Sequence, residues 1–376
     1  MARKGNPKIT VKGLTILYKI FDFARKERNY LIILLVITII CGIVYPYPQV
    51  AMWIVFGLAG YSAIANDSIQ TIGTFISSNS FRKWYYLWLF MGGIFLITIT
   101  YSWLNYDGDI SYDRLKTKGL DTAPSTFSFL QVFAPVILLI LTRLRMPVST
   151  SILLLSAFST KASSIGSILM KSFFGYFLAF LTAIIVWRLT ARYFERYKDT
   201  KPSAAWMPLQ WVTSGLLWSV WIMQDMANIV VVLPRSLELG QFIAVAGFIF
   251  LGLGLLFFLK GDRIQNIVNE KSDIRDVRAA TLVDFIYAIL LYFLKEVSTI
   301  PISTTWVFIG LLGGREFAIN LAKKNREKKK SGIVKSWKII RKDALYAGIG
   351  LLVSIILALS INENMRNQVF DMFYTK

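Results

Sequence analysis

Apolar runs of the length that crosses a lipid bilayer recur along the whole chain. A membrane-spanning helix needs about 20 mostly apolar residues to cross roughly 30 Å of hydrocarbon, and about ten segments approach this pattern, two of them too short to span. The clearest are residues 30–44, 86–101, 129–141, 173–187, 242–259, 282–294 and 344–359. Only 17% of the residues are charged, against about 25% in soluble domains. The sequence therefore predicts an all-α, polytopic integral membrane protein.

Basic clusters between the apolar runs predict how the chain is oriented. Eight lysines and arginines precede Asn29, and ten more, with one glutamate, lie in residues 323–342. By the positive-inside rule, residues 1–29 form a basic cytoplasmic arm and residues 323–342 an orienting cytoplasmic loop, with anionic membrane lipid as a secondary contact. The arm lacks the pattern of a cleavable signal peptide. We expect a multi-pass protein of the plasma (cell inner) membrane.

The composition excludes several kinds of chemistry. The net charge of +20 could suggest nucleic acid, but the basic residues lie in short clusters between apolar runs, so we expect no nucleic-acid partner. Cys41 is the single cysteine, so neither an intramolecular disulfide nor a cysteine metal site can form, and histidine is absent. Charge chemistry must therefore use carboxylates, amides, hydroxyls and backbone dipoles, and we expect no cofactor besides a coupling ion.

Two polar segments divide the chain. Residues 105–126 balance four aspartates against Arg114, Lys116 and Lys118, a composition that favours a solvated connection on the outer side. Residues 191–205 lie near the midpoint and form a polar linker. This organisation predicts a first transmembrane repeat over residues 30–190 and a second over residues 206–376.

An internal repeat supports the two halves. Asn66-Asp67-Ser68-Ile69-Gln70 and Gln224-Asp225-Met226-Ala227-Asn228 each place an aspartate between two carboxamides spaced four apart. Pro147-Val148-Ser149-Thr150-Ser151 and Pro301-Ile302-Ser303-Thr304-Thr305 form a second pair, in the same order within each half. Any one copy is weak, since a lone Pro-x-Ser-Thr is usually an ordinary helix start, but four correlated copies favour a duplicated protein.

Secondary transporters are often built from such repeats, commonly inverted, with the substrate site at their interface near the middle of the membrane. The apolar stretches after the two Pro-x-Ser-Thr motifs, residues 152–158 and 306–312, are too short to cross the membrane. We interpret them as re-entrant half-helices. Broken backbone at membrane depth survives only when it is buried in protein or lines a cavity, which indicates a permeation pathway.

The residue types at these motifs suit an oxyanion and a cation. Helix amino termini offer free N–H donors and about half a positive charge. The substrate-binding candidates are Ser149, Thr150, Ser151, Ser303, Thr304 and Thr305, together with Asp67 and Asp225. Because these motifs hold no lysine or arginine, a co-transported cation could supply the charge.

Asp67 and Asp225 are the candidate ligands of that cation, because an ionisable group at membrane depth costs roughly 3 kcal/mol unless it faces a partner or a cavity. The carboxamides at i and i+4 share a helix face with each other. Carboxylate and amide oxygens are the hard ligands that sodium-like cations favour. The predicted cation site comprises Asn66, Asp67, Gln70, Gln224, Asp225 and Asn228.

These motifs resemble those of the inorganic phosphate transporter (PiT) family, whose members carry a duplicated Gly-Ala-Asn-Asp-x-x-Asn signature and a duplicated Pro-Val-Ser-Thr-Thr-His signature. The resemblance covers roughly residues 51–359 and includes Gly73-Thr74 after the first motif. It implies phosphate uptake coupled to sodium or protons, an inverted-repeat fold and alternating access. The chain departs from the family pattern at Gln224, at Ser151, and at Ile152 and Trp306, which replace the histidines.

The leading hypothesis is a secondary transporter that imports inorganic phosphate with a cation, sodium being favoured over the proton because histidine is absent. Sulfate or another oxyanion is the close alternative. A membrane-embedded lipid-phosphate or sugar transferase is the alternative of another class, with the aspartate-rich residues 107–121 as its sole catalytic candidate; we expect no enzyme. A scaffold or receptor without transport is a third class. The oligomeric state stays open, with a homodimer as one candidate.

Overall fold

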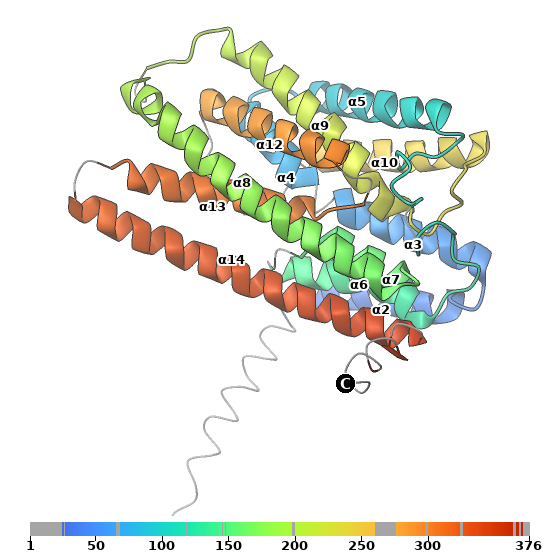
Figure 1. Cartoon of the computed structure of the whole chain (residues 1–376). Helices are drawn as coiled ribbons and strands as arrows, with labels where there is room; N and C mark the ends of the chain where they lie inside the picture. Colours follow the sequence, from blue (N-terminus) through green and yellow to red (C-terminus); the bar gives the residue numbers. More distant parts are fainter. Residues whose placement is uncertain are drawn as a thin grey trace, which may run out of the picture.

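The computed structural model describes residues 25, 27–64, 68–116, 119–144, 146, 148–197, 200–259, 276–297, 300–323, 326–363, 366–367 and 370. Across these residues the chain is helical and contains no strand (Figure 1). The elements are α2 (Arg28–Val44), α3 (Pro48–Ser62), α4 (Ser68–Ser78), α5 (Trp84–Asn105), α6 (Phe129–Arg143), the π-helix η2 (Ser151–Leu155), α7 (Ser156–Phe158), α8 (Ala162–Tyr197), α9 (Trp206–Val230), α10 (Leu239–Phe258), α12 (Val277–Val297), α13 (Thr304–Leu321) and α14 (Arg326–Ile361).

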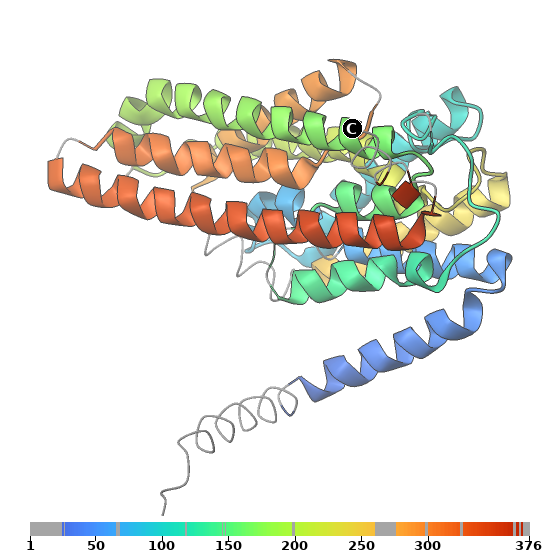
Figure 2. The same cartoon turned by 60° about the horizontal axis from the view of Figure 1, so that its bottom comes forward.

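Five helices in the described part of the chain are long and apolar enough to cross a membrane, namely α5, α8, α10, α12 and α14. Two shorter apolar helices, α2 and α6, accompany them. The long helices run roughly side by side in both views, with their connections gathered at two ends (Figure 2). The prediction of an all-α, polytopic membrane protein is confirmed.

The outer faces of the helices are apolar. On α8, Phe177, Leu181 and Ile185 recur every four residues and are 60%, 56% and 59% exposed. A continuous apolar surface of this kind is unfavourable in water and is what a helix presents to lipid. Burial also separates centre from periphery, because 72% of the apolar window of α12 is buried but only 22% of that of α14. We infer that α12 lies in the protein interior and α14 along the lipid.

Local sequence explains where several helices begin. α3 starts at Pro48, in the first turn, where the missing N–H of proline costs nothing. α6 and α10 both start with a capping box, formed by Ser128 with Gln131 and by Glu238 with Gln241. Within each box, the side chain of each residue accepts a hydrogen bond from the backbone N–H of the other. Ser303 caps α13 in a similar way. These caps fix where α6, α10 and α13 begin.

The short and long helices that follow the Ser-Thr motifs pack reciprocally. α13, from the second half, lies along α8 from the first half, and α14 from the second half packs against η2 and α7 from the first. α8 and α14 are both 36 residues long. Each half thus contributes a long helix that covers the short element of the other. Two interleaved repeats would pack in this way; their inverted relation and the boundaries at residues 30–190, 191–205 and 206–376 stay predictions.

Glycines let α13 approach α8 closely. A Cβ atom on Gly310 would lie 2.4 Å from the carbonyl oxygen of Tyr176, and one on Gly314 would lie 2.3 Å from that of Phe180. Neither could be accommodated without moving backbone. Small residues spaced four apart allow membrane helices to pack backbone against backbone. These two glycines therefore set the distance between the two halves along this pair of helices.

The length predicted for the second half-helix is wrong. The first of the two, residues 150–158, is short and breaks before α8 as expected. The second, expected over residues 306–312, continues as the 18-residue α13. Arg315 and Glu316 extend the helix beyond the apolar run, with a 3.0 Å ion pair between them. Polar residues continue a helix as readily as apolar ones, so the end of an apolar run did not mark the end of the helix.

The expectation of a solvated loop at residues 105–126 is wrong for the middle of the segment. Ile110, Ser111, Arg114 and Leu115 are at most 1% exposed. The loop is bonded to its neighbours: Leu237 N donates to Gly108 O at 2.9 Å, and Thr160 N donates to Gly119 O at 3.0 Å. Its aspartates suggested solvation, but they are partly used inside the loop. The segment closes one end of the bundle.

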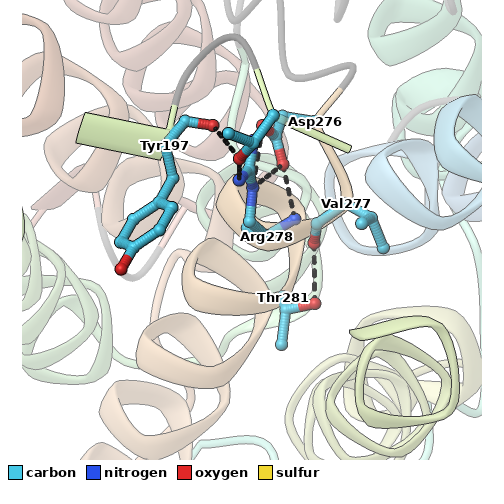
Figure 3. A network of polar contacts seen from close by, with 6 residues as sticks. Tyr197, Asp276, Val277, Arg278 and Thr281 are labelled. Carbon is cyan, nitrogen blue, oxygen red and sulfur yellow. Dashed lines mark hydrogen bonds and ion pairs between the residues drawn. The ribbon is translucent and has the colours of Figure 1, made fainter. Parts of the chain in front are cut away.

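At the opposite end of the bundle, the residues that follow α8 are anchored to the start of α12 (Figure 3). The Arg278 guanidinium pairs with Asp276 at 2.5 Å and donates to Thr200 Oγ1 at 3.3 Å, and Thr200 Oγ1 donates to Tyr197 O at 2.8 Å. Burial alone would raise the pKa of Asp276, but the hydrogen bonds and charge of Arg278 outweigh it and hold that pKa below its usual value. The network ties the end of α8 to the start of α12.

Candidate functional site

The two Ser-Thr motifs start helices with the same local geometry. Ser149 Oγ accepts from Ile152 N at 3.1 Å, and Ser303 Oγ accepts from Trp306 N at 3.2 Å. Each serine therefore caps the N–H three residues on, leaving other first-turn donors without helical acceptors. All six predicted hydroxyl residues, Ser149, Thr150, Ser151, Ser303, Thr304 and Thr305, are at most 4% exposed. Two buried helix starts of this kind can accommodate an anion.

The motifs of the two halves contact each other reciprocally. Asn228 Nδ2 donates to Ser151 Oγ at 2.9 Å, and Gln70 Nε2 donates to Thr305 Oγ1 at 3.3 Å. In both cases the last carboxamide of one half's Asp motif binds the third hydroxyl of the other half's Ser-Thr motif. The sequence predicted the members of these pairs but not their exchange. The structure brings them into one site.

The helix starts also touch directly. Ser151 Oγ donates to the carbonyl oxygen of Ile302 at 2.8 Å, and Asp225 Oδ1 lies 3.4 Å from the same hydroxyl. Tyr287 on α12 donates to Thr304 O at 2.9 Å, and Ser303 N donates to Ser172 Oγ on α8 at 2.9 Å. Both motifs are thus fixed by neighbouring helices, so their donors are preorganised.

Three buried acceptor oxygens at this site have no hydrogen-bond partner within the described residues, and we call them the orphan oxygens. They are Gln70 Oε1, Asp225 Oδ2 and Asn228 Oδ1. A buried polar atom left unpaired costs about 1–3 kcal/mol. All three are carboxylate or amide oxygens, and the donor atoms of the same amides are used on Ser151 and Thr305. A hard cation would satisfy such oxygens and would balance the carboxylate.

Other predicted residues are placed differently. Asn66, Asp67 and Pro147 lie outside the described residues, between α3 and α4 and before η2. Gln224 directly precedes Asp225 in the sequence. Its Oε1 accepts from Arg114 Nη2, and its Nε2 donates to Leu291 O at 2.9 Å. In this conformation Gln224 is engaged with protein groups on both sides of its amide.

Arg114 is a residue of this site that sequence reasoning missed. Its guanidinium is 1% exposed and reaches Gln224, next to Asp225, from the loop between α5 and α6. Burial lowers the pKa of Arg114 to about 10, and the charges of Asp225 and Glu296 oppose this, so the guanidinium stays charged at neutral pH. In the sequence this arginine stands in a loop with four aspartates and resembles a solvated surface charge. No sequence pattern therefore singles it out.

Asp284 was also missed. It is buried in α12 and accepts from Thr74 Oγ1 at 2.7 Å and from Ser214 Oγ at 2.5 Å. These hydroxyls come from α4 and α9, so the carboxylate joins three helices. An isolated acid inside the apolar run of residues 282–294 is costly in lipid, and that signal could have identified it.

The chemistry of the site is set by hydroxyls, amides and few charges. Among the described residues there is no group of three or more histidines, cysteines and acids that could hold a metal ion in the manner of a zinc or calcium site. What the geometry offers is anion donors at two helix starts, three acceptor oxygens for a cation, and one buried guanidinium. This arrangement can bind an anion and a cation together.

Comparison with known proteins places the fold. No protein-family model and no curated protein sequence matches the chain. A solved structure described as "The sodium-dependent phosphate transporter" aligns with a TM-score of 0.52, over 83% of this chain and 99% of that one, at 17% sequence identity. The chain has this transporter's fold. The likeness to phosphate transporters expected from the motifs is thereby confirmed at the level of the fold, although the sequence identity is low, and the inverted relation of the repeats stays a prediction.

Proposed function

We propose that the chain is a secondary active transporter that imports inorganic phosphate together with sodium by alternating access, in the plasma membrane. The observation that carries this proposal is the three orphan oxygens of Gln70, Asp225 and Asn228 beside the two buried helix starts. The hydroxyls that would bind the anion also contact the amides that carry the orphan oxygens. Binding of one ligand would therefore stabilise binding of the other. The transporter fold supports the same function.

In the proposed cycle, the hydroxyls and first-turn N–H groups bind the phosphate oxygens, and the orphan oxygens with the Asp225 carboxylate bind sodium. Because Ser151 touches Asp225, Asn228 and the Ile302 carbonyl, movement of either half would break this site. Rocking of one half against the other around the site would then expose it to each side in turn.

Uptake into proteoliposomes tests this function. Purified protein should accumulate radiolabelled phosphate under an inward sodium gradient, and choline in place of sodium should abolish the accumulation. A proton gradient without sodium separates the two coupling ions. Sulfate and arsenate as competitors separate the oxyanions, since a sulfate carrier would be inhibited more strongly by sulfate than by arsenate. Uptake equal to that of empty liposomes under both gradients would overturn the proposal.

A further inference from the structure

Arg114 brings a fixed charge to a site whose motifs contain no basic residue. Its Nη2 donates to Gln224 Oε1, and the neighbouring Asp225 interacts electrostatically with its guanidinium. Taking a charge out of water costs several kcal/mol even after relaxation. A bond to a neutral amide oxygen is weaker than one to an anion, so the Gln224 contact is one that an anion could replace.

The loop that carries Arg114 holds a demanding backbone conformation. Asp107, Tyr112 and Asp113 have positive φ angles of 52°, 57° and 60°. Such angles cost non-glycine residues about 1–2 kcal/mol each, and they persist only where surrounding bonds over-determine them. Two of the three strained residues directly precede Arg114.

Those surrounding bonds are present. Asp109 accepts from Ser111 N at 2.7 Å, Ser111 Oγ at 2.9 Å and Asp113 N at 2.8 Å. Tyr112 Oη donates to Thr98 O on α5 at 2.6 Å. The loop is therefore a built support that fixes Arg114 in the interior, which a mere connection between α5 and α6 would not require.

We propose that Arg114 is a substrate-binding residue that supplies the fixed positive charge of the oxyanion site and sets its preference among oxyanions. This inference rests on the proposed function. The planar guanidinium presents parallel N–H groups that match two oxygens of a tetrahedral oxyanion. In the absence of the anion it rests on Gln224, near the Asp225 carboxylate.

The position of Arg114 gives a physical order to binding. Without sodium, the Asp225 carboxylate attracts the guanidinium. A sodium ion on the orphan oxygens would neutralise that carboxylate and weaken its attraction for Arg114, so that the guanidinium attracts the anion more strongly. Sodium thus increases the affinity for phosphate without touching the phosphate itself.

Equilibrium binding of radiolabelled phosphate at saturating sodium tests the proposal on the full-length protein. Arg114→Gln should raise the phosphate Kd by about tenfold or more, the loss expected for a charge-assisted bond. Arg114→Lys keeps the charge without the planar fork, so its Kd should lie between those of R114Q and the wild type, with a changed ratio of phosphate to sulfate affinity. Lys116→Gln, on the exposed face of the same loop, is the matched control and should bind as the wild type does.

Binding of ²²Na⁺ without phosphate separates ligand binding from a structural role. R114Q should bind sodium at least as tightly as the wild type, because a positive charge near Asp225 is removed, whereas a loosened site would lose both ligands. The proposal is overturned if R114Q binds phosphate within twofold of the wild type, or if R114K binds phosphate and sulfate as the wild type does. The second comparison also decides the matter if R114Q does not fold. A wild type that binds sodium but neither phosphate nor sulfate would overturn the proposed function, and this inference with it.

Discussion

The two Ser-Thr segments share their first turn and differ beyond it. Ser149 and Ser303 cap the N–H three residues on with nearly equal distances of 3.1 and 3.2 Å. After that turn the first segment continues as the five-residue π-helix η2 and the three-residue α7, whereas the second forms the 18-residue α13. The shared part is the helix start, where free N–H donors are available. The difference teaches that the site constrains the start of each element and leaves its length free.

Among the described residues, the third hydroxyl of the first segment has more polar neighbours than that of the second. Ser151 Oγ lies within hydrogen-bonding distance of Asn228, Asp225 and the Ile302 carbonyl. Thr305 Oγ1 accepts from Gln70. The equivalent position before α4, Asp67, lies outside the described residues. The described half of the site centres on Asp225.

Removing the charge of Asp225 should have the largest effect. We expect Asp225→Asn to lower sodium-driven phosphate uptake by about a hundredfold, the factor that roughly 2.7 kcal/mol produces. Asp225 is the only titratable residue among the described residues that carry the orphan oxygens, so the substitution removes the negative charge that attracts sodium. Uptake into proteoliposomes measures this, with Asp107→Asn in the exposed part of the loop between α5 and α6 as control. Wild-type uptake in D225N would show that the comparison is centred on the wrong residue.

Removing each third hydroxyl compares the two segments directly. Ser151→Ala should raise the KM for phosphate by about tenfold, since a net loss of about 1.4 kcal/mol is expected for a well-connected buried hydroxyl. Thr305→Val removes the longer, 3.3 Å bond with Gln70 and should raise it by about threefold. Concentration dependence of initial uptake rates provides both values. Equal effects would mean that the two segments bind the substrate symmetrically.

Overpacking the contact between α13 and α8 tests whether the packing of the second segment is constrained although its length is not. Gly314→Ala should destabilise the protein by about 1–3 kcal/mol through overpacking, because its Cβ would lie 2.3 Å from Phe180 O. Gly313→Ala is the matched control, since its nearest neighbour would lie at an ordinary 3.4 Å. Melting in detergent, followed by size-exclusion chromatography, should show a lower Tm for G314A alone.

The smallest effect concerns the joint between the halves. The pKa of Asp276 is held below its usual value in the folded state, so its stabilising contribution is present above the unfolded pKa and is lost as the pH falls through the folded value. For a partly exposed pair this amounts to less than about 1 kcal/mol. Asp276→Asn should therefore lower the Tm slightly at neutral pH, and the difference from the wild type should vanish in acid. A constant difference down to low pH would exclude the ion pair as its cause.

The sequence predicted what is periodic or duplicated. Apolar length predicted the membrane helices, and duplication singled out Ser151, Thr305, Gln70 and Asn228, which the structure brings together. Their exchange between halves was not predictable, because spacing along a chain does not say which copy meets which. Arg114 was missed since its loop has the composition of a solvated connection, and the end of α13 was missed since apolar length measures lipid contact and not helix length.

The 36-residue length of α8 and α14 limits how these two helices can lie in a membrane. At 1.5 Å per residue each helix is about 54 Å long, well beyond the roughly 30 Å hydrocarbon core. The end of α8 and the start of α14 lie at the same end of the bundle, to the left in Figure 1. A helix of this length must either extend beyond the hydrocarbon core or lie tilted within it.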